Sequence, residues 1–121
     1  MIYNVPVEAR RNRLIADLRG LAEFLERHPE VPVPRYGSVR MSVYPLYDTD
    51  ATTEAEAIIE VARIATLLGV PLRVEHGHHV ARADFGTVCY EAILITQAAR
   101  DRRAAQDSYR DNISTDPPVG A

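Results

Sequence analysis

The sequence predicts an α+β fold in which two amphipathic helices cover one face of an antiparallel sheet of about four strands. Helical periodicity over residues 7–28 and 53–69, and short apolar segments between residues 72 and 95, support this prediction. The expected order is α-β-α-β-β-β-α, a two-layer sandwich that ends in a polar C-terminal helix. We expect one domain over residues 1–110 and a flexible tail over residues 111–121.

The first predicted helix covers residues 7–28 and carries a leucine stripe. Pro6 suits its first turn, and Pro29 cannot continue it. A proline-rich connector then leads to a strand at about residues 38–44, where apolar and polar residues alternate. The stripe recurs at helical spacing and consists of Leu14, Leu18, Leu21 and Leu25.

The second predicted helix begins with a capping box. Thr53 and Glu56 have the spacing at which each side chain accepts a hydrogen bond from the backbone N–H of the other. Gly69 is expected to end the helix in the left-handed conformation, and Pro71 prevents a further turn. The apolar face of this helix is expected to contain Ile58, Val61, Ala65 and Leu68.

Three further strands are expected at residues 72–75, 79–83 and 87–95, and the last of them is apolar on both faces. Ile93 and Ile95 fall on the face opposite the expected core. A strand of this kind is typically covered on both sides, whereas the two amphipathic helices serve only one. Ile93 and Ile95 are therefore the candidate protein-binding surface, with cover by other segments of the same chain as the alternative.

Loop lengths decide which residues of these strands face the core. A three-residue loop from His76 to His78 would place Val74 opposite Val80. A second loop, Asp84-Phe85-Gly86, would place Val80 opposite Tyr90. The core face in this register consists of Leu72, Val74, Val80, Val88, Tyr90, Ala92 and Leu94.

Three of the four histidines lie within the segment VEHGHHVARADFG, residues 74–86. His76, His78 and His79 could supply two or three imidazole ligands to zinc, copper or nickel. Their spacing matches no defined zinc motif. The alternative is a solvated polar turn, so the sequence leaves a metal site open without favouring it.

All 14 basic residues are arginines, and the formal net charge is −3. Arginines at the start of the first helix oppose the helix dipole, and a second group stands on the last helix. Both groups form a candidate nucleic-acid surface, for which a solvated charged face is the alternative because the total charge is acidic. The candidate residues are Arg10, Arg11, Arg13, Arg100, Arg102 and Arg103.

The sequence contains no P-loop, dinucleotide fingerprint or nucleophile elbow. The single cysteine, Cys89, lies within an apolar strand, where a thiol is usually inert. We therefore expect no catalytic residues, no cofactor and no enzymatic activity. No apolar segment approaches the ~20 residues that cross a bilayer, and no secretory signal is recognisable, so a cytoplasmic protein is expected.

Two segments, LRGLAEFLERHPEVPVP (residues 18–34) and ARADFGTVCYEAILI (residues 81–95), resemble small uncharacterised α+β proteins encoded by actinobacteria and their phages or integrated elements. The resemblance implies a fold more than an activity, because that family has no assigned catalytic residues. The chain departs from the family after Ile95, where an arginine-rich helix follows, and at Gly86-Thr87-Val88, where further glycines are common.

These observations lead to three hypotheses about function. The first is a non-enzymatic accessory protein of actinobacterial or phage origin that acts through protein–protein contact, as a homodimer through Ile93 and Ile95. The second is a small nucleic-acid-binding regulator that uses the arginine groups. The third is a metal-dependent activity at the three clustered histidines.

Overall fold

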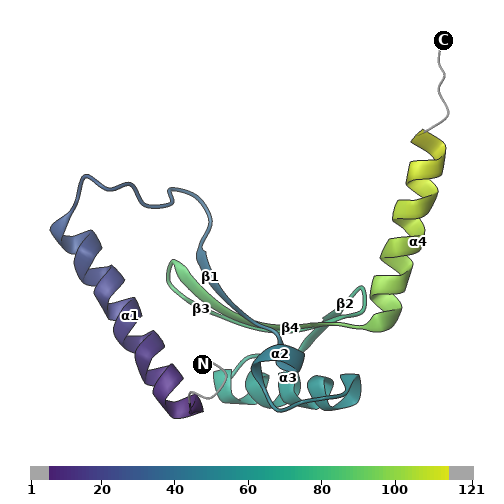
Figure 1. Ribbon diagram of the computed structural model, residues 1–121, viewed down its shortest axis with the longest axis horizontal. Helices are drawn as coiled ribbons and strands as arrows, with labels where there is room; N and C mark the ends of the chain where they lie inside the picture. Colours follow the sequence, from purple (N-terminus) through teal and green to yellow (C-terminus); the bar gives the residue numbers. More distant parts are fainter. Residues whose placement is uncertain (1–5, 115–121) are drawn as a thin grey trace, which may run out of the picture. The chain divides into compact units, whose positions relative to one another are not determined.

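The computed structural model describes residues 6–114, and side chains up to residue 108. Four helices and a four-stranded sheet form this part of the chain, which confirms the α+β class (Figure 1). Residues up to Tyr36 and residues from Gly37 onward form two compact units. In order, the elements are α1 (Val7–Arg27), β1 (Val39–Val43), α2 (Pro45–Asp48), α3 (Glu54–Leu68), β2 (Arg73–Glu75), β3 (His78–Phe85), β4 (Val88–Ile95) and α4 (Gln97–Ser114).

The N-terminal unit contains α1, whose bounds match the predicted helix to within one residue. Pro6 precedes the first turn, and the N–H of His28 closes the last turn on the carbonyl of Phe24 at 3.0 Å. No residue of α1 is buried, and most of the leucine stripe is exposed. Cover of the sheet by this helix stays a prediction.

In the second unit, β1 ends at Val43, and Pro45 begins the short helix α2, which the sequence did not predict. Proline suits the first position of a helix because it lacks the N–H that would be unpaired there. The Asp48 carboxylate accepts a hydrogen bond from the Tyr44 N–H at 2.8 Å, and the Thr49 hydroxyl donates to the Pro45 carbonyl at 2.6 Å. These local bonds stabilise a turn for which the sequence has no periodic signal.

Helix α3 begins with the predicted capping box. The Thr53 hydroxyl accepts from the Glu56 N–H at 3.1 Å, and the Glu56 carboxylate accepts from the Thr53 N–H at 3.3 Å. Glu56 also accepts from the N–H of Thr52 at 2.8 Å and from its hydroxyl at 2.9 Å. At the other end, Gly69 takes the left-handed conformation with φ +70°, as predicted.

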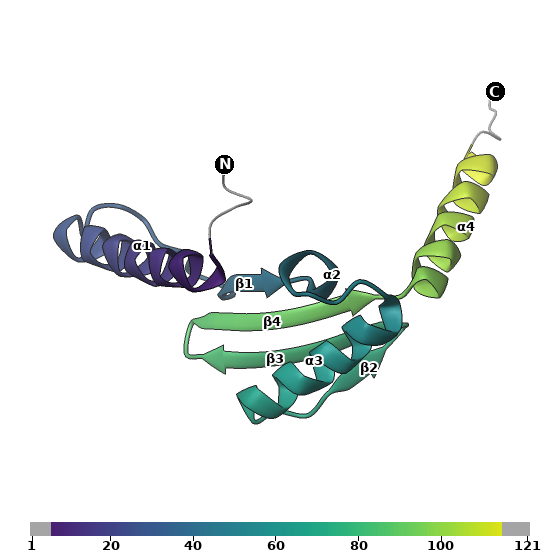
Figure 2. The same cartoon turned by 60° about the horizontal axis from the view of Figure 1, so that its bottom comes forward.

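The sheet has the strand order β1-β4-β3-β2 and is mixed, which corrects the prediction of a purely antiparallel sheet. Strands β2 and β3 pair antiparallel, as do β3 and β4, whereas β1 pairs with β4 in parallel. The parallel pair follows from α3, because a helical crossover returns the chain to the starting end of the sheet. Figure 2 shows α3 on one face of the sheet.

Both hairpin loops have two residues, so the predicted register is wrong. The first loop is His76-Gly77, with φ values of +53° and +79°; positive φ at both central positions characterises the type I′ turn. The second loop is Gly86-Thr87, because Phe85 pairs with Val88. As a result Val74 pairs with His79 and Val80 with Ile93, instead of Val74 with Val80 and Val80 with Tyr90.

This shift inverts β3. Ala81 is buried and pairs with Ala92, so Val80 points to the opposite face, away from the predicted core. Tyr90, Ala92 and Leu94 lie on the core side, as predicted. The remaining predicted core residues are exposed: Leu72 before β2, Val74 within β2, and Val88 at the start of β4.

The core lies between α3 and the central strands. Small side chains dominate it, so helix and sheet can approach closely. Its buried cluster consists of Ala57, Val61, Ile64, Ala65, Ala81, Ala92 and Leu94.

Helix α4 begins at Gln97, with only Thr96 between it and β4, and extends four residues into the predicted tail. The Gln97 N–H donates to the Glu54 carboxylate at 2.8 Å, and the Ala99 N–H donates to the Thr96 hydroxyl at 3.2 Å. The first turn of α4 is therefore fixed to the start of α3. The predicted tail is helical up to Ser114, and its residues 115–121 lie outside the described residues.

Candidate functional site

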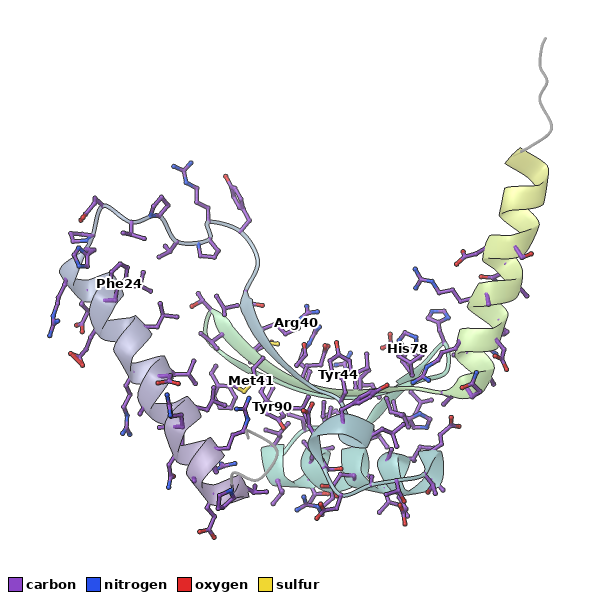
Figure 3. All side chains as sticks on the ribbon, viewed as in Figure 1. Phe24, Arg40, Met41, Tyr44, His78 and Tyr90 are labelled. Carbon is purple, nitrogen blue, oxygen red and sulfur yellow. The ribbon has the colours of Figure 1, made fainter. Side chains whose placement is uncertain are left out.

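The face of the sheet opposite α3 is the first candidate surface; we call it the open face. Figure 3 shows Arg40 and His78 on this side, and Met41 and Tyr90 on the side of α3. Strand alternation and pairing assign its residues. They are Arg40 and Ser42 of β1, Arg73 and Glu75 of β2, His78, Val80, Arg82 and Asp84 of β3, and Cys89, Glu91, Ile93 and Ile95 of β4.

One half of the open face is apolar. Ile93 pairs with Val80, and both side chains, like Ile95, are only partly buried. Tyr44 and Tyr47, which are 47% and 83% exposed, lie beside them around a shallow hollow of about 40 Å³. The structure thus places Ile93 and Ile95 on the side of β4 away from the core and adds aromatic neighbours that the sequence analysis did not select.

The other half of the open face is charged and centres on Glu91. This residue is 7% exposed although it lies on the side away from α3. Its carboxylate accepts a hydrogen bond from the Arg82 guanidinium at 2.9 Å and lies 3.8 Å from that of Arg40. The bond to Glu91 raises the pKa of Arg82 above its ordinary value. The sequence analysis missed this cluster, because only strand pairing brings the three residues together.

The three histidines do not form a ligand set. His78 and His79 are neighbours on β3 and so point to opposite faces, while His76 lies in the turn. The Nδ1 atom of His79 is buried, and among the described residues it has no hydrogen-bond partner. Among the side chains that the structure describes, no group of three or more His, Cys, Asp or Glu residues could hold a metal ion.

Three of the six candidate arginines belong to the N-terminal unit and three to the second unit. Arg10, Arg11 and Arg13 are exposed on α1, and Arg13 lies 3.9 Å from the Asp17 carboxylate. Arg100 borders the hollow beside Ile93 and Ile95. The last two, Arg102 and Arg103, lie on the surface of α4 that meets the β2–β3 turn.

A groove of about 620 Å³ lies between this turn and the side of α4 that carries Arg102 and Arg103. It joins two motifs that the sequence analysis treated separately, the histidine turn and the α4 arginines. No sequence signal links them, because their proximity depends on where β4 ends. The lining residues are His76, Gly77, His78, Ala99, Arg102, Arg103, Gln106 and Asp107.

No protein-family model, curated protein or solved structure matches the chain. None of the helices in the described part of the chain is both long and apolar enough to cross a membrane.

Proposed function

We propose that this chain is a non-enzymatic accessory protein, of the actinobacterial or phage-encoded kind that its two motifs resemble, and that it acts through protein–protein contact. The contact is a homodimer formed by the apolar half of the open face. One observation carries the proposal: β4 has apolar side chains on both sides, and α3 packs against only one of them. Apolar surface of this kind gains free energy when a partner covers it.

A second copy of the chain suits this surface because the surface is self-complementary. A two-fold axis near Ile93 would place Val80, Ile93 and Ile95 of each copy against the same residues of the other, as in an isologous interface. Exposed Tyr44 and Tyr47 would lie at the margin, and tyrosine is enriched at protein interfaces. Glu91 is already paired with Arg82, so no unpaired carboxylate at the centre of the open face opposes association.

Light scattering after size-exclusion chromatography tests the proposal. We expect the wild-type protein to be a dimer, and the double variant Ile93→Glu, Ile95→Glu to be a monomer, because four carboxylates would face one another across the axis. The matched control is Ile59→Glu, Leu67→Glu, which adds the same charge at positions 68% and 71% exposed on α3. This control should remain dimeric.

Circular dichroism establishes that each variant is folded, and Tyr44→Arg probes the same surface at an exposed position. A wild-type protein that is monomeric at high concentration would refute the homodimer. A dimer that persists in the Ile93→Glu, Ile95→Glu variant and dissociates in the α3 control would assign the interface to the other side of the molecule.

A further inference from the structure

We infer that the groove between the β2–β3 turn and α4 binds a small ligand that carries a diphosphate group. This site adjoins the proposed dimer surface, because His78 lines the groove and pairs with Ile95, but the inference does not rest on the dimer. The inference rests on three features of the groove: fixed walls, arginines without acidic partners, and a set of donors suited to phosphate oxygens.

The two walls of the groove contact each other at the first turn of α4. The Thr96 N–H donates to the Gly77 carbonyl at 3.2 Å. A Cβ atom on Gly77 would lie 2.7 Å from the Ala99 Cβ and 3.0 Å from Arg102 Nη2, so glycine permits this close packing. A site whose walls are fixed before binding loses little conformational entropy when the ligand binds.

The arginines of the groove differ from the five described arginines that have an acidic partner. Arg13, Arg27 and Arg63 each have a carboxylate of the same helix within 4.0 Å. Arg102 and Arg103 have no such partner among residues 6–108. Asp107 also lines the groove, but it takes part in an interaction of its own. Two guanidinium groups without an ion-pair partner among residues 6–108 therefore line the groove.

The donors around the groove suit a diphosphate. A guanidinium group donates two parallel N–H bonds to phosphate oxygens, and two such groups match two adjacent phosphates. The imidazoles of His76 and His78 and the amide of Gln106 can donate from around the same space. The volume of about 620 Å³ falls in the range of small-ligand sites.

A small ligand fits these charges better than a nucleic acid. Asp101 and Asp107 interrupt the arginines along α4, and the net charge of the chain is −3. An extended polyanion needs a continuous basic surface that follows its backbone, and the attraction weakens steeply with salt. The groove instead has two arginines, Arg102 and Arg103, around a single cavity.

The test is a titration of the full chain with inorganic pyrophosphate at near-physiological salt, followed by calorimetry and by amide NMR shifts. We expect binding to shift the amide signals of Gly77, Thr96 and Ala99, which form the wall. The variant Arg102→Ala, Arg103→Ala should bind at least about tenfold more weakly. The control Arg19→Ala, Arg35→Ala removes the same charge from exposed positions in the N-terminal unit and should bind as the wild type does.

A second variant, Arg102→Lys, Arg103→Lys, retains the charge but loses the two-pronged geometry, and it should also bind more weakly than the wild type. Three results would overturn the inference. The first is no shift with about 10 mM pyrophosphate. The second is equal weakening in both alanine variants. The third is a short single-stranded RNA that binds through Arg102 and Arg103 while pyrophosphate does not, which would assign the groove to nucleic acid.

Discussion

Gly77 shows at the scale of one residue how a turn and a helix depend on each other. Its φ of +79° is unfavourable for any residue with a Cβ atom, and the space that a Cβ would need is filled by Ala99. Gly86 provides a comparison within the same sheet, since its φ is +69° but nothing lies within 4 Å of the position that a Cβ would occupy. Substitution of Gly86 therefore introduces backbone strain alone, whereas substitution of Gly77 introduces backbone strain and steric overlap.

We expect Gly86→Ala to lower the free energy of unfolding by about 1 kcal/mol, the cost of a left-handed alanine. Gly77→Ala should lower it by about 1–3 kcal/mol more, because the added methyl group must displace Ala99 or the turn. Urea unfolding of both variants measures the difference. If both variants lose the same free energy of unfolding, α4 can move away from the added methyl group at no cost in stability. That result would also argue against a fixed groove wall.

Glu91 is the second informative residue, because burial of its carboxylate depends on two arginines. We expect Glu91→Ala to destabilise the fold by about 1–2 kcal/mol, less than for a fully buried pair, because Arg40 and Arg82 are about half exposed. Glu75→Ala, an exposed glutamate of the same sheet, should change stability by less than about 0.5 kcal/mol. Chemical denaturation compares the two, and a neutral Glu91→Ala would mean that the cluster contributes no stability.

At the scale of the element, α3 depends on its first turn. The Thr53 hydroxyl satisfies the Glu56 N–H, which no carbonyl within the helix can reach. We expect Thr53→Ala to cost about 1 kcal/mol of stability. Thr66→Ala is the control, because the Thr66 hydroxyl only donates back to the Ala62 carbonyl within the helix. A loss in the control as large as in Thr53→Ala would contradict a special role for the cap.

The same turn predicts a dependence on pH. Hydrogen bonds from the Thr52 backbone, the Thr52 hydroxyl and the Thr53 backbone lower the pKa of Glu56 below its ordinary value of 4.5. A carboxyl whose pKa is lowered by folding stabilises the folded state above its ordinary pKa and loses this contribution as the pH falls through the lowered value. The Tm difference between wild type and Glu56→Ala should therefore narrow below about pH 4.5. A difference that stays constant down to pH 2 would refute this.

At the scale of the whole molecule, self-association links stability to concentration. When only folded chains dimerise, the free energy of unfolding increases with protein concentration. We expect the Tm of the wild type to rise by about 5 °C over a hundredfold increase in concentration. The Tm of the Ile93→Glu, Ile95→Glu variant should not change. A wild-type Tm that does not depend on protein concentration would contradict the homodimer. It would not bear on the inferred diphosphate site in the groove.

Features that depend on local contacts could be predicted from the sequence. The bounds of α1, the capping box at Thr53 and Glu56, and the left-handed Gly69 were all predictable, because each involves periodicity or bonds between near neighbours. The apolar side chains on both sides of β4 were also predictable, because side chains alternate between the two faces along a single strand.

Only the tertiary structure decided how distant segments pair. Two-residue turns set the register that moved Val80 to the open face, and the crossover through α3 made β1 parallel to β4. The same pairing brought Glu91 between two arginines, and the path of the chain after β4 brought Arg102 close to Gly77. These arrangements depend on turn geometry and backbone hydrogen bonds between strands, and a shift of one residue reverses every side chain without changing the local pattern.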